Sequence, residues 1–360
     1  MVRRSFSFVL GLSLLTAGAG GVVAQTPAAR GPVDVSAFDT KVRPQNDLYE
    51  YVNGTWLKET PIPADKSNYG AFIKLDDLSR ERIRTIVEKA AAEQAPAGSD
   101  ARKVGDFHRA FMDTERLAKL GHAPLDPILA RIDGISNHEE IAHAFGAAGS
   151  FGVGSPIGHF VSIDDKDSTR HLTTVVQGGT TLPDRDYYLK DGEKETAARK
   201  ALVAYVDTLA KLVGDKTAHP GETVLEVEKK LAEIQWPRVE LRDAIKTYNK
   251  FKAAEFAAKT PHIPWRAFAE AAGTPGIAEV NVATPSYFEK LDGLFPAIDV
   301  ATWKTWLRFK LLDAYAAYLS PDFEKAHFDF HGRAIAGIQE ELPRWKRSVE
   351  AISGKGAGDF

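Results

Sequence analysis

Apolar residues recur at helical spacing along most of the chain, which predicts a mainly helical protein. The clearest example is the segment 71–94, where charged residues lie opposite one continuous apolar stripe. That stripe consists of Phe72, Leu75, Leu78, Ile83, Ile86, Val87 and Ala90. The same spacing predicts further helices over residues 99–121, 126–132, 137–148, 193–213, 221–234, 251–258, 265–272, 287–295, 300–319 and 334–352. We expect the last helix to kink or restart at Pro343, because proline interrupts helical hydrogen bonding.

The helical spacing is interrupted between residues 149 and 177, where glycines and β-branched residues gather. Apolar residues sit among glycines in 149–165, and 171–177 is rich in threonine and valine. This composition favours two strands of a small hairpin or sheet. The predicted fold class is therefore mainly α, a helical-bundle lobe with a small β insertion near residues 150–178.

The segment 46–58 is predicted to be a short, aromatic anchor helix ahead of the bundle. Asn53 and Gly54 should end this helix, because both residue types tolerate the left-handed backbone of a helix stop. Pro61 and Pro63 then force an extended passage, since each fixes its own φ and restricts the preceding residue.

The amino terminus has the pattern of a secretory signal peptide, predicted over residues 1–24. Arg3 and Arg4 precede an apolar run at 6–17 that is too short to span a bilayer. The alternative is an uncleaved membrane anchor. Cleavage would leave a flexible lead-in at 25–45 and no stable membrane span, so we expect an exported protein, in a periplasm or outside the cell.

Composition narrows the chemistry that the chain can carry. The 360 residues contain no cysteine, which excludes disulfides, thiol catalysis and thiolate zinc sites. The net charge is −3, and no basic stripe with interleaved aromatic residues is found. A nucleic-acid partner is therefore not expected.

Two pairs of histidines invite comparison with metal sites. His138 and His143 are five residues apart, about 140° around a helix axis, so they cannot share one ion as the two histidines of HExxH do. We expect a carboxylate pair at a helix start, with both histidines on the surface. His327 and His331 have the helical i, i+4 spacing, but the pair lacks an adjacent glutamate and a third ligand. A structural pair is favoured over a metal site, so no metal ligand and no catalytic residue is assigned.

The octet LPDRDYYL at 182–189 is the most distinctive motif of the chain. Its Pro-Asp pair favours a turn, and its two tyrosines can anchor the loop with an apolar ring and a polar tip. From physical chemistry alone, the octet indicates a packed loop with an Arg–Asp interaction.

Several motifs in order resemble the N-terminal region of the neprilysin-type family of zinc metallopeptidases. They are YEYVNGTW at 49–56, QGG at 177–179, LPDRDYYL at 182–189, LRD at 241–243, TYN at 247–249 and PRWKR at 343–347. The resemblance spans about residues 36–350. The motif residues that we expect to be structural are Asn53, Gly54, Trp56, Pro183, Asp184, Arg185, Asp186, Tyr187, Tyr188, Arg344 and Trp345.

The resemblance implies an enzyme of two lobes. A catalytic lobe carries HExxH and zinc, which activates a water for attack on the peptide bond, while a helical lobe encloses the oligopeptide substrate. Residues 59–352 resemble the helical lobe, and 46–58 would pack on the catalytic one. Asn68 and Asp76 match positions where neprilysin has arginines near the substrate, so they are candidate substrate-facing residues without the arginine preference for a terminal carboxylate.

No HExxH motif is found in the 360 residues, and residues 353–360 are glycine-rich and depart from the family. We expect a truncated, frameshifted or incompletely assembled gene product; a genuine short protein is the alternative. The chain would then be the N-terminal part of an exported zinc endopeptidase, inactive alone and with zinc only in the complete enzyme. Otherwise it is a stand-alone peptide-binding or regulatory module, or, less favoured, a hydrolase that uses His327 and His331. The first hypothesis expects no stoichiometric zinc in the purified chain.

Overall fold

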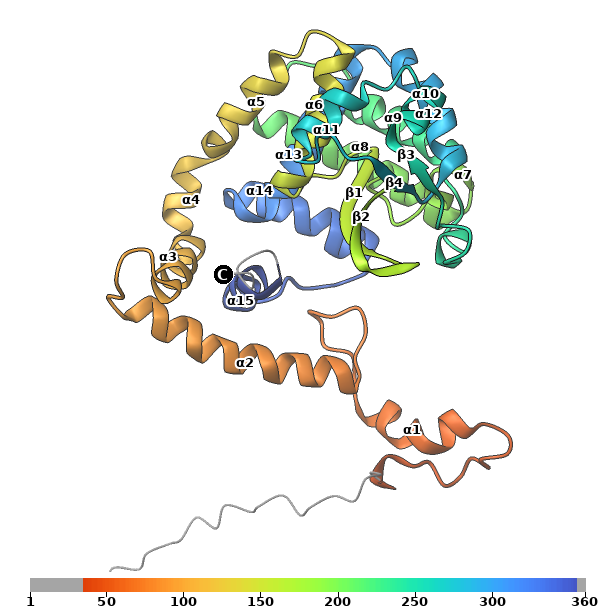
Figure 1. Ribbon diagram of the computed structural model, residues 1–360. Helices are drawn as coiled ribbons and strands as arrows, with labels where there is room; N and C mark the ends of the chain where they lie inside the picture. The colour runs from red at the N-terminus through yellow and green to blue at the C-terminus, as the bar shows by residue number, and fades with distance from the viewer. Residues whose placement is uncertain (1–34, 355–360) are drawn as a thin grey trace, which may run out of the picture. The chain divides into compact units, whose positions relative to one another are not determined.

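Helices make up most of residues 35–354, the part of the chain that the computed structural model describes (Figure 1). The predicted signal peptide lies outside these residues. The chain divides into two units, the first ending at Pro61 and the second beginning at Ile62. Within residues 35–354, no helix combines the length and the apolar character that crossing a bilayer requires.

The first unit is built around α1 (Leu48–Glu59), preceded by the short 3-10 helix η1 (Val35–Ala37). Asp47 caps α1, because its side chain accepts the backbone N–H of Glu50 at 2.8 Å. The helix therefore begins where the anchor segment was predicted.

The predicted helix stop at Asn53 and Gly54 is wrong, because α1 continues through both residues to Glu59. Gly54 serves close packing instead: a Cβ there would lie 2.8 Å from the Cβ of Asp39. Asp39 also donates its backbone N–H to the carbonyl of Tyr51 at 2.8 Å. A glycine that admits a neighbouring loop looks, in sequence, like a glycine that ends a helix.

One end of the second unit is a group of helices in which α2 packs beside α3 and α15. Its helices are α2 (Ala71–Ala92), α3 (Asp100–Met112), α4 (Thr114–Leu120) and α15 (Arg344–Gly354). The single helix predicted over 99–121 is wrong, since Asp113 ends α3 and caps α4 by accepting the N–H of Arg116 at 3.0 Å. The helix predicted over 334–352 is wrong for residues 336–343, which are not helical, but α15 begins directly after Pro343, where a restart was predicted.

The remaining helices gather around a small sheet, and α4 leads to them from the first group (Figure 1). They are α5 (Asp126–Asp133), α6 (His138–Ala148), α7 (Asp186–Leu189), α8 (Glu193–Leu212), α9 (Pro220–Ile234), α10 (Ala253–Lys259), α11 (Trp265–Ala271), α12 (Pro285–Ala297), α13 (Val300–Tyr315) and α14 (Pro321–His327), which a π-helical segment, η6 (Phe328–Ile335), continues. Short 3-10 turns are η2 (Ala123–Leu125), η3 (Gly149–Phe151), η4 (Glu240–Arg242) and η5 (Ala316–Tyr318). Trp303 and Trp306 are fully buried at their centre, and the ring of Phe145 lies 5.1 Å from that of Trp303.

The sheet has four strands in the order β1-β2-β4-β3. The strands are β1 (Ile157–Asp164), β2 (Asp167–Gln177), β3 (Lys250–Lys252) and β4 (Glu279–Val282). The predicted hairpin is confirmed as the antiparallel pair β1–β2, with Ile157 opposite Gln177. Sequence analysis missed β3 and β4, because strands of three and four residues are too short to show a period of two. The predicted mainly α fold with a small β insertion is confirmed.

Helix α2 does not bury most of the apolar face that its sequence predicted would be buried. Of the predicted stripe, only Val87 and Ala90 are buried. Phe72 is 89% exposed and Leu75 is 63% exposed, and Leu78 and Ile86 are exposed as well. The described residues thus leave most of an apolar helix face uncovered.

The contact between α6 and α11 depends on Gly146, where a Cβ would lie only 2.2 Å from the carbonyl oxygen of Phe268. A backbone oxygen cannot swing away, so we expect Gly146→Ala to lower the free energy of unfolding by about 1–3 kcal/mol. Gly293→Ala on α12 is the matched control, because no atom lies within 4 Å of its Cβ position. It should gain about 0.5–1 kcal/mol from helix propensity. Urea unfolding measures both, and a stabilised Gly146→Ala variant would contradict the close contact.

Candidate functional site

The two candidate substrate-facing residues lie on the surface near the start of α2. Asn68 is exposed in the loop before α2, where its Nδ2 donates to the hydroxyl of Ser67 at 3.3 Å. Asp76 is exposed on α2 and forms an ion pair of 2.9 Å with Arg80, one turn later. Both side chains can be reached from solvent, and their role in substrate contact stays a prediction.

Tyr188 of the octet is buried and holds the loop by its hydroxyl. The hydroxyl oxygen accepts the backbone N–H groups of Thr181 at 3.0 Å and Leu182 at 2.8 Å. It donates in turn to the carboxylate of Glu228 on α9. Burial raises the pKa of Tyr188 well above its ordinary value, and the charge of Glu228 raises it further. The phenol therefore stays protonated and acts as a fixed donor.

The other polar residues of the octet shape the turn. Asp184 accepts the backbone N–H of Asp186 at 2.8 Å, which makes a local Asx turn. Arg185 donates from Nε to the carbonyl of Ala232 on α9 at 3.1 Å. The packed loop is as expected, but the arginine binds a backbone carbonyl rather than the aspartate that physical reasoning suggested.

A buried ion pair beneath this loop joins three parts of the second unit. Glu228 on α9 is 0% exposed, and its Oε1 lies 3.7 Å from Nζ of Lys310 on α13. Thr181 lies between them: its hydroxyl donates to Glu228 at 2.7 Å and accepts from Lys310 at 2.8 Å. Trp306 donates from Nε1 to the same carboxylate at 3.3 Å. The octet loop, α9 and α13 are thus connected through one carboxylate.

The PRWKR motif also makes contacts between helices, in this case at the start of the final helix, α15. Arg344 and Arg347 both pair with the carboxylate of Glu324 on α14. Burial would raise the pKa of Glu324, but the two guanidinium groups hold it below its ordinary value. The guanidinium of Arg84 on α2 lies 4.4 Å from the ring centre of Trp345. These contacts join α15 to α14 and to α2.

The first histidine pair lies at a helix start, as predicted, but only His143 is a surface residue, since His138 is half-buried. His138 opens α6, where its Nε2 contacts the carbonyl oxygen of Ile298 at 2.8 Å. Glu140 in the first turn accepts the backbone N–H of Ser136 at 2.7 Å, which is a capping contact. His143 is exposed one turn farther on.

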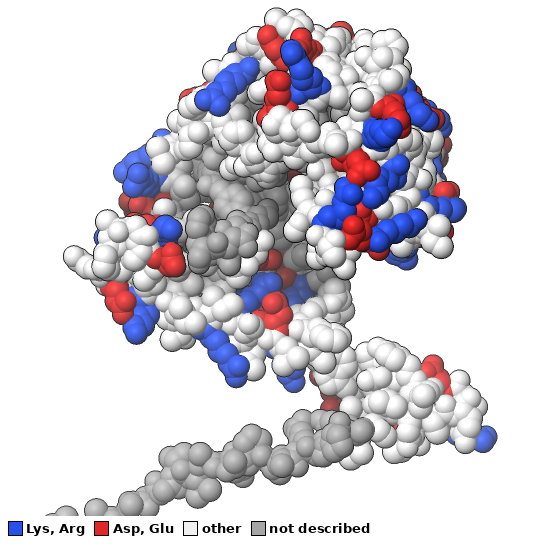
Figure 2. Space-filling model, in the orientation of Figure 1, with Lys and Arg blue, Asp and Glu red and all other residues white. Residues whose placement is uncertain are grey.

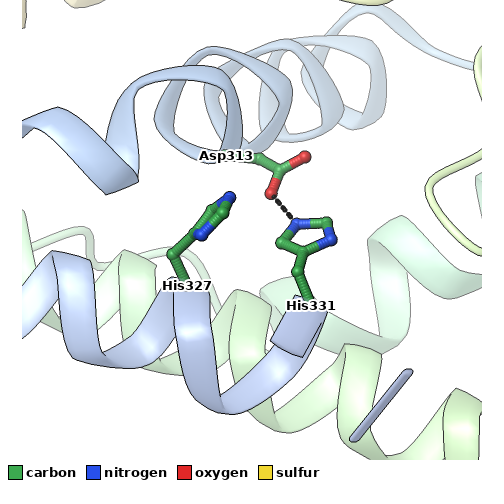
Figure 3. A group of neighbouring side chains, drawn as sticks. All are labelled: Asp313, His327 and His331. Atoms are coloured by element: carbon green, nitrogen blue, oxygen red, sulfur yellow. Dashed lines mark hydrogen bonds and ion pairs between the residues drawn. The ribbon is translucent and has the colours of Figure 1, made fainter. Parts of the chain in front are cut away.

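The second histidine pair meets a third polar group that sequence analysis did not assign to it (Figure 3). His327 and His331, from α14 and η6, point toward Asp313 on α13. The possible ligand atoms of the three side chains all lie within 4.8 Å of one another. Nε2 of His331 is 2.7 Å from Oδ1 of Asp313, and the hydroxyl of Tyr205 donates to that oxygen at 3.0 Å.

The surroundings of this triad favour an ionised carboxylate. Burial would raise the pKa of Asp313, but the hydrogen bond from His331 and the charge of Lys310 hold it below its ordinary value. His327 and His331 line a cavity of about 470 Å³. Four carboxylates also line that cavity, together with a single arginine: Asp65, Glu340, Glu341, Glu350 and Arg347. Two imidazoles and a carboxylate are ligands for a borderline dication, but they are not an HExxH arrangement.

Charged side chains elsewhere form no single-sign patch on the visible face. Acidic and basic groups are interspersed over it (Figure 2). This agrees with the small net charge of the chain.

The chain is similar in sequence to one protein family and in fold to solved structures. Residues 44–357 match the model of Peptidase family M13. The chain is 28% identical over 336 residues to human endothelin-converting enzyme 1, an alignment that covers 88% of this chain and 42% of that protein. An endothelin-converting enzyme homologue of Locusta migratoria is 28% identical over 341 residues, covering 88% and 46%.

Among solved structures, the crystal structure of the Mycobacterium tuberculosis zinc metalloprotease ZMP1 with an inhibitor is similar, with a TM-score of 0.85 and 34% identity. The match covers 90% of this chain and 50% of that chain. The chain therefore spans about half the length of the relatives that it matches.

We expect the buried ion pair of Glu228 and Lys310 to contribute to the free energy of unfolding. Glu228→Gln keeps an acceptor for Tyr188 but removes the carboxylate that pairs with the buried ammonium of Lys310. We expect a loss of about 3–5 kcal/mol in the free energy of unfolding, measured by urea titration. Glu226→Gln, an exposed change on the same helix, should stay within about 0.5 kcal/mol of the parent. Equal effects of the two changes would show that the ion pair does not hold α9 to α13.

Proposed function

The chain belongs to Peptidase family M13, and we propose that it forms the N-terminal, substrate-enclosing lobe of an exported zinc metalloendopeptidase that cleaves oligopeptides. The observation that carries this proposal is the extent of the match: nearly the whole chain aligns, yet with only about half of each relative. The 360 residues contain no HExxH. We therefore assign no step of zinc-dependent peptide cleavage to this chain and place that centre in the other half of the enzyme.

The uncovered face of α2 supports a partner of that kind. Leu75, Leu78 and Ile86 are all exposed within the described residues. Fully burying one such side chain is worth roughly 1.5–3 kcal/mol. Contiguous exposed apolar residues on a soluble protein commonly mark an interface. We take the zinc-bearing half that the relatives contain as the occupant of this face.

The anchor helix supports the same reading in the first unit. Leu48 and Tyr49 of α1 are largely exposed, at 64% and 67%. Tyr51 is better packed, with its ring 5.2 Å from that of Phe38. The proposed role of 46–58 is to dock on the catalytic half with its exposed aromatic side.

Substrate preference and export complete the proposal. Asn68 carries no charge, and Asp76 is paired with Arg80, so neither offers a free cation to the terminal carboxylate of a peptide. A preference that depends on such a carboxylate is not proposed. Export is supported by the basic and apolar pattern at 1–24, which predicts a periplasmic or extracellular enzyme.

The proposal implies that the chain alone cleaves no peptide. Purified chain, incubated with a mixture of oligopeptides and followed by mass spectrometry, should release no fragments above a blank, with or without added zinc. The M. tuberculosis protease ZMP1, assayed in parallel, is the positive control. Fragments that disappear when a chelator is added would contradict the assignment of the cleavage centre to the other half. Binding of metal without cleavage would leave the assignment intact.

A further inference from the structure

We propose that Asp313, His327 and His331 bind one divalent transition-metal ion of the Zn²⁺, Co²⁺ and Ni²⁺ class. The inference goes beyond the proposed function, because it concerns residues of this chain alone. It also replaces the expectation from sequence that no residue here is a metal ligand. That expectation depended on the lack of a third ligand beside the histidine pair. The fold supplies one, since α13 brings Asp313 to within 2.7 Å of His331.

The spacing of the ligand atoms is close to what a small dication needs. In a tetrahedral zinc site, with metal–ligand bonds of about 2.0–2.1 Å, neighbouring ligand atoms are about 3.3 Å apart. Here the atoms of the three side chains lie within 4.8 Å of one another, and the two imidazole rings are 4.5 Å apart between centres. The three side chains thus lie near the spacing of a small-dication site.

The carboxylate is already oriented for such a role. Tyr205 and His331 both contact Oδ1 of Asp313. Among the described residues, no hydrogen bond to Oδ2 is found, so that oxygen can serve as a ligand while Tyr205 keeps its bond to Oδ1. Outer hydrogen bonds of this kind fix the orientation of metal ligands in known sites. The ion would take the place of the proton on Nε2 of His331, with Oδ2 of Asp313 as the neighbouring ligand atom.

The cavity beside the histidines provides an entry path and an open coordination position. His327 and His331 line it, so a water molecule on the cavity side can complete a four-coordinate site. Four carboxylates and one arginine around the cavity give it an excess of negative charge, which favours entry of a cation.

A plain histidine–aspartate pair elsewhere in the chain serves as the comparison. Nδ1 of His262 contacts Oδ2 of Asp292 at 2.7 Å, the same distance as in the triad. No group of three possible metal ligands within residues 35–354 includes that pair. If the contact of His331 with Asp313 were only such a pair, the second histidine would make no difference to metal binding.

The experiment titrates untagged, metal-stripped full-length chain with Zn²⁺ by calorimetry and with Co²⁺ by visible absorption. We expect one ion per chain and a Co²⁺ spectrum of low coordination number. His327→Gln removes one proposed ligand and keeps the bond between His331 and Asp313. It should weaken binding by about 100-fold or more, at least as much as the loss of an outer-shell partner does. His262→Gln should leave the affinity unchanged. Each variant is checked by circular dichroism.

Two results would overturn the proposal. The first is the lack of saturable binding by the parent chain at one equivalent of Zn²⁺ or Co²⁺. The second is an affinity of the His327→Gln variant equal to that of the parent, which would place the ion elsewhere. Neither result bears on peptide cleavage, so the proposed function is tested separately.

Discussion

The buried ion pair between Glu228 and Lys310 is the constraint on which the centre of the second unit depends. A carboxylate and an ammonium that are both removed from water need each other and their hydrogen-bond partners, because either charge alone would be costly. Thr181 and Tyr188 supply those partners from the octet loop. The position of α13 is thereby fixed against α9 and against the most distinctive motif of the chain.

The position of α13 also determines where Asp313 lies, one turn beyond Lys310. Asp313 follows on the same side of the helix and meets His331 there, with Tyr205 of α8 as a second partner. The two polar contacts tie α13 to α8 and to η6. The family motif and the histidine triad are thus parts of one arrangement: the loop that identifies the chain positions the helix that supplies the third ligand.

Sequence patterns predicted the helices well because their spacing is a local property. The same patterns did not predict the contacts that depend on tertiary packing. Lys310 and Asp313 lie on the Trp306 side of α13, where they interrupt an apolar face, and such an interruption indicates buried polar contacts. Gly54 shows the opposite case, since nothing local distinguishes a glycine that admits Asp39 from one that ends a helix.

The face of α2 could not be assigned from sequence for a different reason. Phe72 and Leu75 belong to an apolar stripe that predicts burial, yet the described residues leave them exposed. The pattern is intelligible if the surface that covers them belongs to another part of the enzyme. The chain also aligns with only about half of each relative.

Reading the gene beyond the codon for Phe360, in all three frames, tests the central claim most directly. If the chain is the enclosing lobe of an M13 peptidase, an HExxH motif should follow within a stretch about as long as the chain itself, in frame or in a shifted frame. A downstream sequence of that length without the motif in any frame would contradict the claim and favour a stand-alone peptide-binding module.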